Sequence, residues 1–104
     1  MIISIDYDHT YTRDPKLWDE FAKNAIKNGH TVYCVSARAE ADMVEPKNTI
    51  GQIIGPANCF GTNLQPKREF MIKKHNIRID VWIDDQPFFI DGDYTTGLIM
   101  PYTP

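Results

Sequence analysis

The stretch IISIDYDHT, at residues 2–10, joins a short apolar run to two closely spaced carboxylates. Ile2–Ile5 is rich in β-branched residues, which is typical of a buried strand. Asp6 and Asp8 follow at once, and both carboxylates can face one site if the chain curls after the strand. We therefore predict a strand of the central sheet here, with an acidic site at its carboxyl end.

Strand-like and helix-like segments alternate along the rest of the chain. Further strands are predicted at Thr31–Val35, around Phe60, at Ile79–Ile83 and at Leu98–Met100. Helices are predicted between Pro15 and Gly29, over Ala37–Glu45 with Pro46 ending the helix, and from Pro66 onward. This alternation is typical of βαβ units, and it predicts an α/β fold. A parallel central sheet would form the middle of three α/β/α layers, as in Rossmann-like domains.

The first of these helices has the clearest signals. Asp14 is a typical N-cap residue, and Pro15 suits the first helical position. Apolar residues recur at helical spacing, at Leu17, Trp18, Phe21, Ala22, Ala25 and Ile26. This spacing predicts one apolar face that packs on the core.

The composition narrows the class of protein. The 104 residues suffice for one domain, which we assign to residues 1–104. The formal charge of -3 argues against broad binding to nucleic acid or to an anionic membrane. The sequence shows neither a targeting segment nor a membrane span, and its two cysteines indicate no disulfide framework. We therefore expect a cytoplasmic protein.

Polar residues cluster where three predicted strands end. Asp6 and Asp8 follow the first strand, Ser36 the second, and Asp84 and Asp85 a later one. Because ligands of parallel α/β sheets bind outside the carboxyl ends of the strands, these side chains should meet at one edge. One aspartate can attack phosphorus and a second can act as acid and base. Crowded carboxylates also need a cation, and Mg²⁺ prefers their oxygens.

Four segments in this order resemble the motifs of the haloacid dehalogenase (HAD) superfamily. IISIDYDHT resembles its first motif, a strand followed by Asp-x-Asp-x-Thr, and VYCVSAR (residues 32–38) resembles the second. Lys67 in QPKREF suits the lysine of the third motif, and VWIDDQP (residues 81–87) resembles the acidic fourth. The resemblance covers most of the chain, and the ordered set is more specific than any single motif.

The resemblance implies a role for each residue of these motifs. Asp6 would be the nucleophile and Asp8 the general acid and base, while Lys67 would hold the nucleophile and the phosphate together. Thr10 and Ser36 would bind the substrate. The expected activity is that of a Mg²⁺-dependent phosphatase that forms an aspartyl-phosphate intermediate.

The resemblance also implies the metal ligands. Asp6 would bind Mg²⁺ through its carboxylate, and Tyr7 and Asp8 would bind it through backbone carbonyls. Asp85 would be the metal-binding carboxylate of the fourth motif, with Asp84 beside it in support.

Three points stay open in the sequence. His9 stands where many members of the superfamily have glycine, so the loop geometry there can differ. Lys73 and Lys74 lie near Lys67 on the same predicted helix and compete for its role. Arg38, two residues beyond Ser36, either aids phosphate binding or is solvated.

The spacing of the motifs leaves no room for a cap domain. There are 27 residues between Asp8 and Ser36 and 30 between Ser36 and Lys67, and the predicted helices and strand use them. The chain thus resembles capless members, whose open sites suit large substrates such as phosphoproteins or nucleic-acid ends. A small phosphomonoester would fit if a second subunit of a homo-oligomer covered the site.

The sequence also leaves functions other than a phosphatase open. A catalytically weak module of the same fold, which binds a phosphate or nucleotide or has a regulatory role, is the main alternative, because fold does not fix function. Receiver and Toprim-like domains fit less well, since the adjacent pair Asp84-Asp85 comes late here and Asp-x-Asp comes first. Phe88 and Phe89 are expected to pack in the core rather than at the site mouth.

Overall fold

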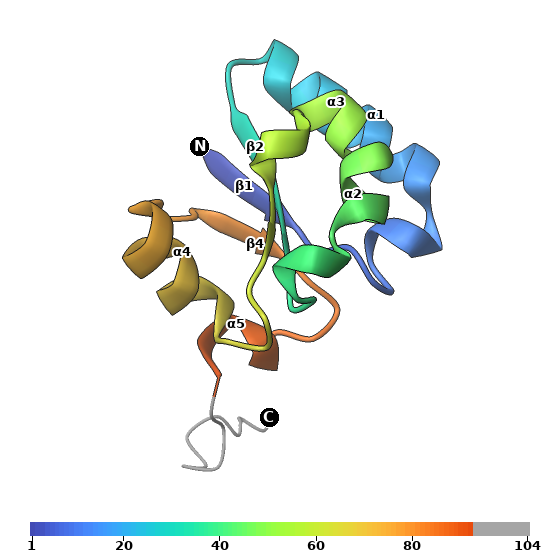
Figure 1. The fold of residues 1–104 in the computed structure, drawn as a ribbon. Helices are drawn as coiled ribbons and strands as arrows, with labels where there is room; N and C mark the ends of the chain where they lie inside the picture. The colour runs from blue at the N-terminus through green and yellow to red at the C-terminus, as the bar shows by residue number, and fades with distance from the viewer. Residues whose placement is uncertain (93–104) are drawn as a thin grey trace, which may run out of the picture.

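The computed structural model of the protein describes residues 1–92, which form an α/β fold on a four-stranded sheet (Figure 1). The strands are β1 (Ile2–Ile5), β2 (Thr31–Ser36), β3 (Cys59–Gly61) and β4 (Val81–Ile83). All pairs are parallel, and the order across the sheet is β3-β2-β1-β4. The predicted α/β class and parallel sheet are thus confirmed, while the predicted strand at Leu98–Met100 lies outside the described residues.

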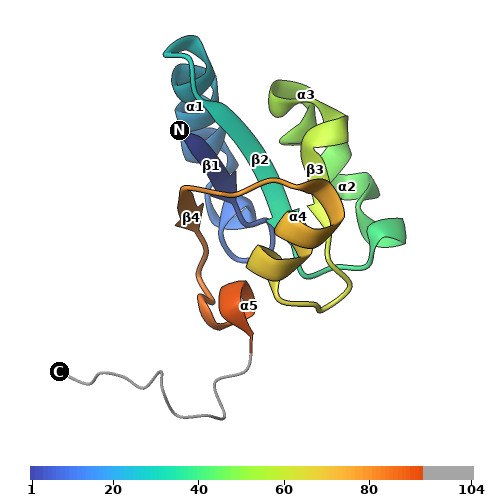
Figure 2. The ribbon, with the colours of Figure 1, turned by 90° about the vertical axis from the view of Figure 1, so that its left-hand side faces the viewer.

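Helices lie on both sides of the strands in this part of the chain. The α-helices of residues 1–92 are α1 (Pro15–Lys27), α2 (Val44–Asn48), α3 (Gly51–Ile54), α4 (Lys67–His75) and α5 (Phe88–Asp91). Short 3₁₀ helices lie at Tyr11–Arg13, Glu40–Asp42 and Pro56–Asn58. Figures 1 and 2 show α1, α2 and α3 on one side of the strands and α4 on the other, with α5 near the start of α4. This arrangement is compatible with a Rossmann-like fold.

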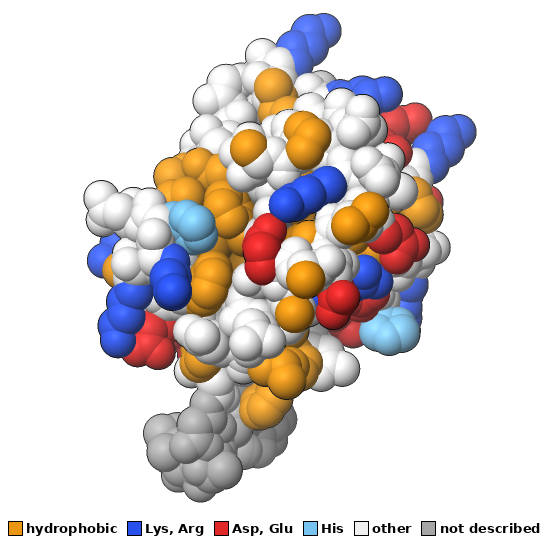
Figure 3. Space-filling model, viewed as in Figure 1, with side chains coloured by type: hydrophobic (Ala, Val, Ile, Leu, Met, Phe, Trp, Pro, Cys, Tyr) orange, Lys and Arg blue, Asp and Glu red, His pale blue; other side chains and the backbone are white. Residues whose placement is uncertain are grey.

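None of the helices in residues 1–92 combines the length and the apolar character that crossing a bilayer requires. On the face shown in Figure 3, basic, acidic and apolar side chains are interspersed. Some opposite charges pair locally on the described surface, such as Lys47 with Glu40 at 3.0 Å and Lys73 with Glu69 at 2.8 Å. This face therefore shows no broad basic area, in keeping with the net charge of -3.

β1 lies inside the sheet because both of its edges are paired. Ile5 is in register with Cys34 of β2 on one side and with Ile83 of β4 on the other. Ile3 and Ile5 are buried in the core beneath α1. The backbone N–H of Asp6 donates to the Ile83 carbonyl at 2.9 Å, so the pairing of β1 with β4 continues to the first acidic residue.

α1 begins as predicted but buries a narrower face. The Asp14 carboxylate accepts the backbone N–H of Leu17 at 3.2 Å, as an N-cap should. Ala22 and Ala25 are buried, whereas Leu17 and Ile26 stay 51% and 41% exposed, so the prediction of a fully packed face is wrong at these two positions. At about 100° per residue, both lie about 90° from the middle of the apolar stripe, on opposite flanks.

The segment after β2 also differs from the prediction. The predicted helix over Ala37–Glu45, ending at Pro46, is wrong: residues 37–38 form a bend, a short 3₁₀ helix covers Glu40–Asp42, and α2 begins only at Val44. Pro46 is the third residue of α2 and is buried. Proline is tolerated there because the first N–H groups of a helix have no partner within the helix. The bend carries Arg38 toward the end of β1.

The end of β3 packs directly on this bend, and this contact yields a stability prediction. A Cβ added at Gly61 would lie 2.7 Å from the Arg38 carbonyl oxygen and 2.9 Å from the backbone of Ala39. Gly61→Ala should therefore lower the free energy of unfolding by about 1–3 kcal/mol, measured by urea denaturation. Gly51→Ala, whose added Cβ would come no closer than 3.2 Å to its neighbours, is the control and should change stability much less. Equal stability of Gly61→Ala and the wild type would contradict the tight contact.

Candidate active site

A cavity of about 170 Å³ lies at the carboxyl ends of β1, β2 and β4. Its wall contains the side chains that the sequence places at this edge, namely Asp6, Asp8, Ser36, Lys67, Asp84 and Asp85. The remaining wall residues are His9, Ala37, Gln86 and Phe89. The parallel sheet thus brings together chemically reactive groups that are far apart in the sequence.

Lys67 is the buried cation of this cavity. It is the first residue of α4, and it is only 1% exposed. Its ammonium donates to Asp6 Oδ1 at 2.8 Å and to Asp84 Oδ2 at 2.6 Å. Lys73 and Lys74 are exposed on the same helix. The structure therefore turns Lys67, and neither of the two competing lysines, toward Asp6.

Two hydroxyl groups lie close to the carboxylates. The Thr10 hydroxyl is 3.1 Å from Asp6 Oδ2 and 3.2 Å from Asp85 Oδ1, so its single proton is shared between two acceptors. Thr10 is buried and braces these two residues without lining the cavity, where we expected it to bind substrate. Ser36 does line the cavity, and its oxygen accepts the Arg38 N–H at 3.1 Å. The Ser36 O–H proton is thus left to donate to another acceptor.

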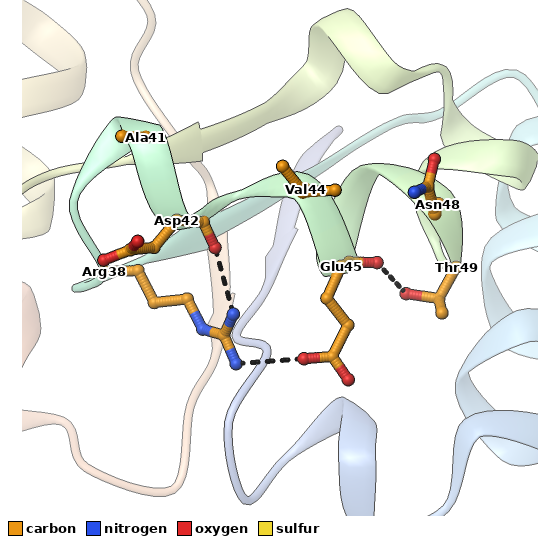
Figure 4. A pocket seen from close by; sticks show the side chains of 7 residues that line it. All are labelled: Arg38, Ala41, Asp42, Val44, Glu45, Asn48 and Thr49. Atoms are coloured by element: carbon orange, nitrogen blue, oxygen red, sulfur yellow. Dashed lines mark hydrogen bonds and ion pairs between the residues drawn. The ribbon is translucent and has the colours of Figure 1, made fainter.

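Arg38 lies beside the cavity and pairs with Asp8. Its Nε and Nη2 donate to the two carboxylate oxygens of Asp8, both at 2.9 Å. Figure 4 shows its further bonds to the Asp42 carbonyl at 3.0 Å and to the Glu45 carboxylate at 3.3 Å. The guanidinium also lies 5.1 Å from the centre of the Tyr7 ring. Arg38 lines a separate groove of about 700 Å³ on α2, so it holds Asp8 and does not face the cavity.

Asp6 and Asp8 are in different electrostatic environments. Burial raises the pKa of Asp6 to about 6, although the charge of Lys67 opposes this shift. Hydrogen bonds from Arg38 lower the pKa of Asp8 below its ordinary value. At neutral pH both groups are therefore ionised, Asp6 as a potential nucleophile and Asp8 as a potential proton acceptor.

Three carboxylates of the cavity can hold a metal ion. Asp6, Asp84 and Asp85 each offer one oxygen, and these oxygens all lie within 4.8 Å of one another. Together with the Lys67 ammonium they leave two negative charges, which a divalent cation would neutralise. Such an oxygen donor set fits a hard cation such as Mg²⁺ without selecting it over others. The Asp8 carboxylate is not part of this set.

Of the two backbone carbonyls expected to bind the metal, that of Tyr7 is already engaged. It accepts the N–H of Thr12 at 3.1 Å and the N–H of Thr10 at 3.3 Å, which uses both lone pairs of the oxygen. The Asp8 carbonyl accepts no hydrogen bond from the described residues. Asp8 therefore stays a candidate metal ligand through its backbone, and Tyr7 does not.

Two residues at the cavity had no assigned role in the sequence. His9 has a φ of 65°, in the left-handed region that favours glycine, and its N–H donates to the Thr12 hydroxyl at 2.9 Å. Phe89 lines the cavity, whereas core packing was expected, and Ile90 is the buried residue of α5. A helix of four residues is too short for its apolar spacing to indicate which side chain faces inward.

The raised pKa of Asp6 predicts how the metal-free fold responds to pH. In the folded protein Asp6 titrates near 6, against an ordinary value of 3.8, so its charged form costs stability. In EDTA, Asp6→Asn should be more stable than the wild type by roughly 1–3 kcal/mol at about pH 8. The difference should shrink as pH falls through about 6 and disappear below about 4, where the aspartate is neutral in both the folded and the unfolded state.

Urea denaturation across this pH range measures the effect. Asp91→Asn, at an exposed carboxylate paired with Arg68, is the control and should show a much smaller dependence on pH. A stability difference between Asp6→Asn and the wild type that stays constant from about pH 4 to 8 would contradict the raised pKa.

Comparisons with known proteins add no further guide to function. No protein-family model matches the chain, and no curated protein or solved structure is significantly similar to it. The function of the cavity is therefore inferred from the geometry and chemistry of its own residues.

Proposed function

We propose that the protein is a Mg²⁺-dependent phosphatase of the HAD type, which hydrolyses a phosphomonoester through an aspartyl-phosphate on Asp6. The observation that carries this proposal is the buried contact of Lys67 with both Asp6 and Asp84, beside Asp85. It supports the proposal because a carboxylate nucleophile, a fixed cation and metal-binding oxygens meet at one small cavity. The proposal includes the three-layer, capless form of the fold.

This chain supplies several groups that can hold a phosphate. The Lys67 ammonium and the Ser36 hydroxyl, which both line the cavity, can donate hydrogen bonds to phosphoryl oxygens. Mg²⁺, held by Asp6, Asp85 and the Asp8 carbonyl with Asp84 nearby, would neutralise negative charge on the nucleophile and the phosphate. Thr10 would fix the orientation of Asp6 through its hydroxyl contact.

The reaction takes two steps. An Asp6 oxygen attacks phosphorus, the bond to the ester oxygen breaks, and that oxygen leaves with a proton from Asp8. Water then attacks the phosphorus of the aspartyl-phosphate, gives a proton to Asp8, and the bond to Asp6 breaks to release phosphate. With both oxygens of Asp8 accepting from Arg38, its observed position suits the second step. Proton donation in the first step requires Asp8 to leave Arg38 and to take up a proton from water before it can give that proton to the leaving oxygen.

The bidentate Arg38–Asp8 pair also favours a second candidate function. Because it keeps Asp8 ionised and engaged, it suits a catalytically weak module that binds a phosphate or nucleotide in a regulatory role. Binding of Mg²⁺ and inorganic phosphate in calorimetry, without phosphate release from any ester, would favour this module. Fast turnover of a phosphomonoester would exclude it.

The phosphatase proposal predicts phosphate release in the presence of Mg²⁺. The panel should contain small phosphomonoesters, phosphopeptides and oligonucleotides phosphorylated at either end, since the proposal covers both small and macromolecular esters. Asp6→Asn and EDTA should each abolish release, because one removes the nucleophile and the other the cation. Release that persists in Asp6→Asn would overturn the assignment of Asp6.

The position of Lys67 predicts a sharp difference among the lysines of α4. Lys67→Gln should lower kcat/KM by about 10²–10³-fold, because the cation next to the nucleophile is lost. Lys73→Gln and Lys74→Gln, at exposed sites on the same helix, are matched controls and should leave kcat/KM within about twofold. Circular dichroism checks that each variant is folded. Comparable losses in all three variants would contradict the special role of Lys67.

A further inference from the structure

A second hollow adjoins the acidic cavity. This hollow, of about 370 Å³, shares His9, Asp84 and Asp85 with the cavity as a common wall. We call it the Leu17 groove, after the most exposed apolar residue that lines it. The groove and the cavity therefore lie next to each other. A group esterified to a phosphate in the cavity can reach over their common wall into the groove.

The lining of the Leu17 groove is largely apolar. Leu17 and Trp18 contribute from α1, and Ile83 contributes from the end of β4. The Trp18 ring packs edge-on against Phe21, with 5.8 Å between ring centres, which fixes the indole. Leu17 is 51% exposed although it belongs to an amphipathic helix, so its side chain lies at the groove and not in the core. Apolar side chains left accessible beside a polar site are typical of a ligand contact.

Two further residues of the groove are suited to a ligand. Arg13 lies at the groove and forms no ion pair with any residue of the described chain, so its guanidinium can lie over an aromatic face. His9, on the shared wall, keeps a left-handed backbone that most side chains avoid. Histidine adopts this conformation more readily than most residues, and the exposed His9 side chain lines the mouth of the groove.

We propose that the Leu17 groove is the leaving-group subsite, and that it takes a flat, uncharged aromatic ring joined to the phosphate by a short link. This inference rests on the proposed function only for the place of the phosphate, in the cavity of Asp6. The ring would pack on Leu17 and Trp18, with Arg13 at its face. A polyhydroxylated leaving group would bury less apolar surface against Leu17 and Trp18 and would therefore gain less from this contact.

The hollow on α2 is the other candidate for the leaving group, and it is the more polar of the two. It is lined by the carboxylates of Asp42 and Glu45 and by the polar side chains of Asn48 and Thr49. Ala41 and the exposed Val44 line it as well. Among residues 1–92, the hollow on α2 shares no lining residue with the acidic cavity, whereas the Leu17 groove shares three. The apolar group of the substrate is therefore assigned to the Leu17 groove, on the other side of the cavity wall.

Binding of two phosphonates that cannot be hydrolysed tests the proposal. Phenylphosphonate and methylphosphonate share the acidic head and differ in the ring, and calorimetry with Mg²⁺ measures the Kd of each for the full chain. The wild type should bind phenylphosphonate about tenfold more tightly, as expected when about 60 Å² of the ring is buried. Leu17→Ser should remove most of this preference. Ile26→Ser, at an exposed apolar residue on the opposite flank of α1, should keep it.

The outcomes separate this proposal from the phosphatase itself. Equal affinities of the wild type for the two phosphonates, or an unchanged preference in Leu17→Ser, would overturn the subsite even if phosphate is released from esters. A ring preference that only Leu17→Ser removes would support the subsite even if no ester is hydrolysed. A peptide carrying phosphonomethylphenylalanine should bind no more tightly than phenylphosphonate. Much tighter binding of that peptide would overturn the ring as the determinant.

Discussion

The ammonium of Lys67, buried between the carboxylates of Asp6 and Asp84, is the contact on which the geometry of the cavity depends. A buried charge without a partner is costly, so the ammonium of Lys67 must stay where the two carboxylates can pair with it. The contact also joins three elements, because Lys67 begins α4 while the aspartates follow β1 and β4. The side chains of one ion-pair network thus fix the start of a helix over the edge of the sheet.

The parts of the fold with strong local signals could be predicted from the sequence. β1 follows from a β-branched run, and the start of α1 follows from Asp14 and Pro15. The course of the chain around Pro46 could not be predicted, because a proline reads alike as the end of a helix and as part of its first turn. The exposure of Leu17 could not be predicted either, since the width of the buried stripe depends on how α1 packs against α3 and β2.

The acidic edge of the sheet could be predicted from the topology. The carboxyl ends of parallel strands lie at the same edge, so polar residues that follow these strands come together there. The sequence favoured Lys67 but left Lys73 and Lys74 open, because the choice depends on how α4 is turned. Lys67 lies one helical turn before the buried Met71, on the face that meets the sheet. The pairing of Arg38 with Asp8 depends on the bend at residues 37–38, whose conformation no periodic pattern specifies.

The continuation of sheet pairing to Asp6 has a consequence for how Asp6 and Asp8 move. Asp6 is anchored through its backbone to β4 and through its side chain to Lys67 and Thr10, so its position is set by the slow, collective motions of the sheet. Asp8 lies beyond the last strand pairing, and its carboxylate is held by a side-chain contact with Arg38 that can exchange on the much faster time scale of rotamer changes. The carboxylate of Asp6 is therefore held more firmly than the carboxylate of Asp8. A substitution of Arg38 can change the position of the Asp8 carboxylate without altering the contacts that hold Asp6.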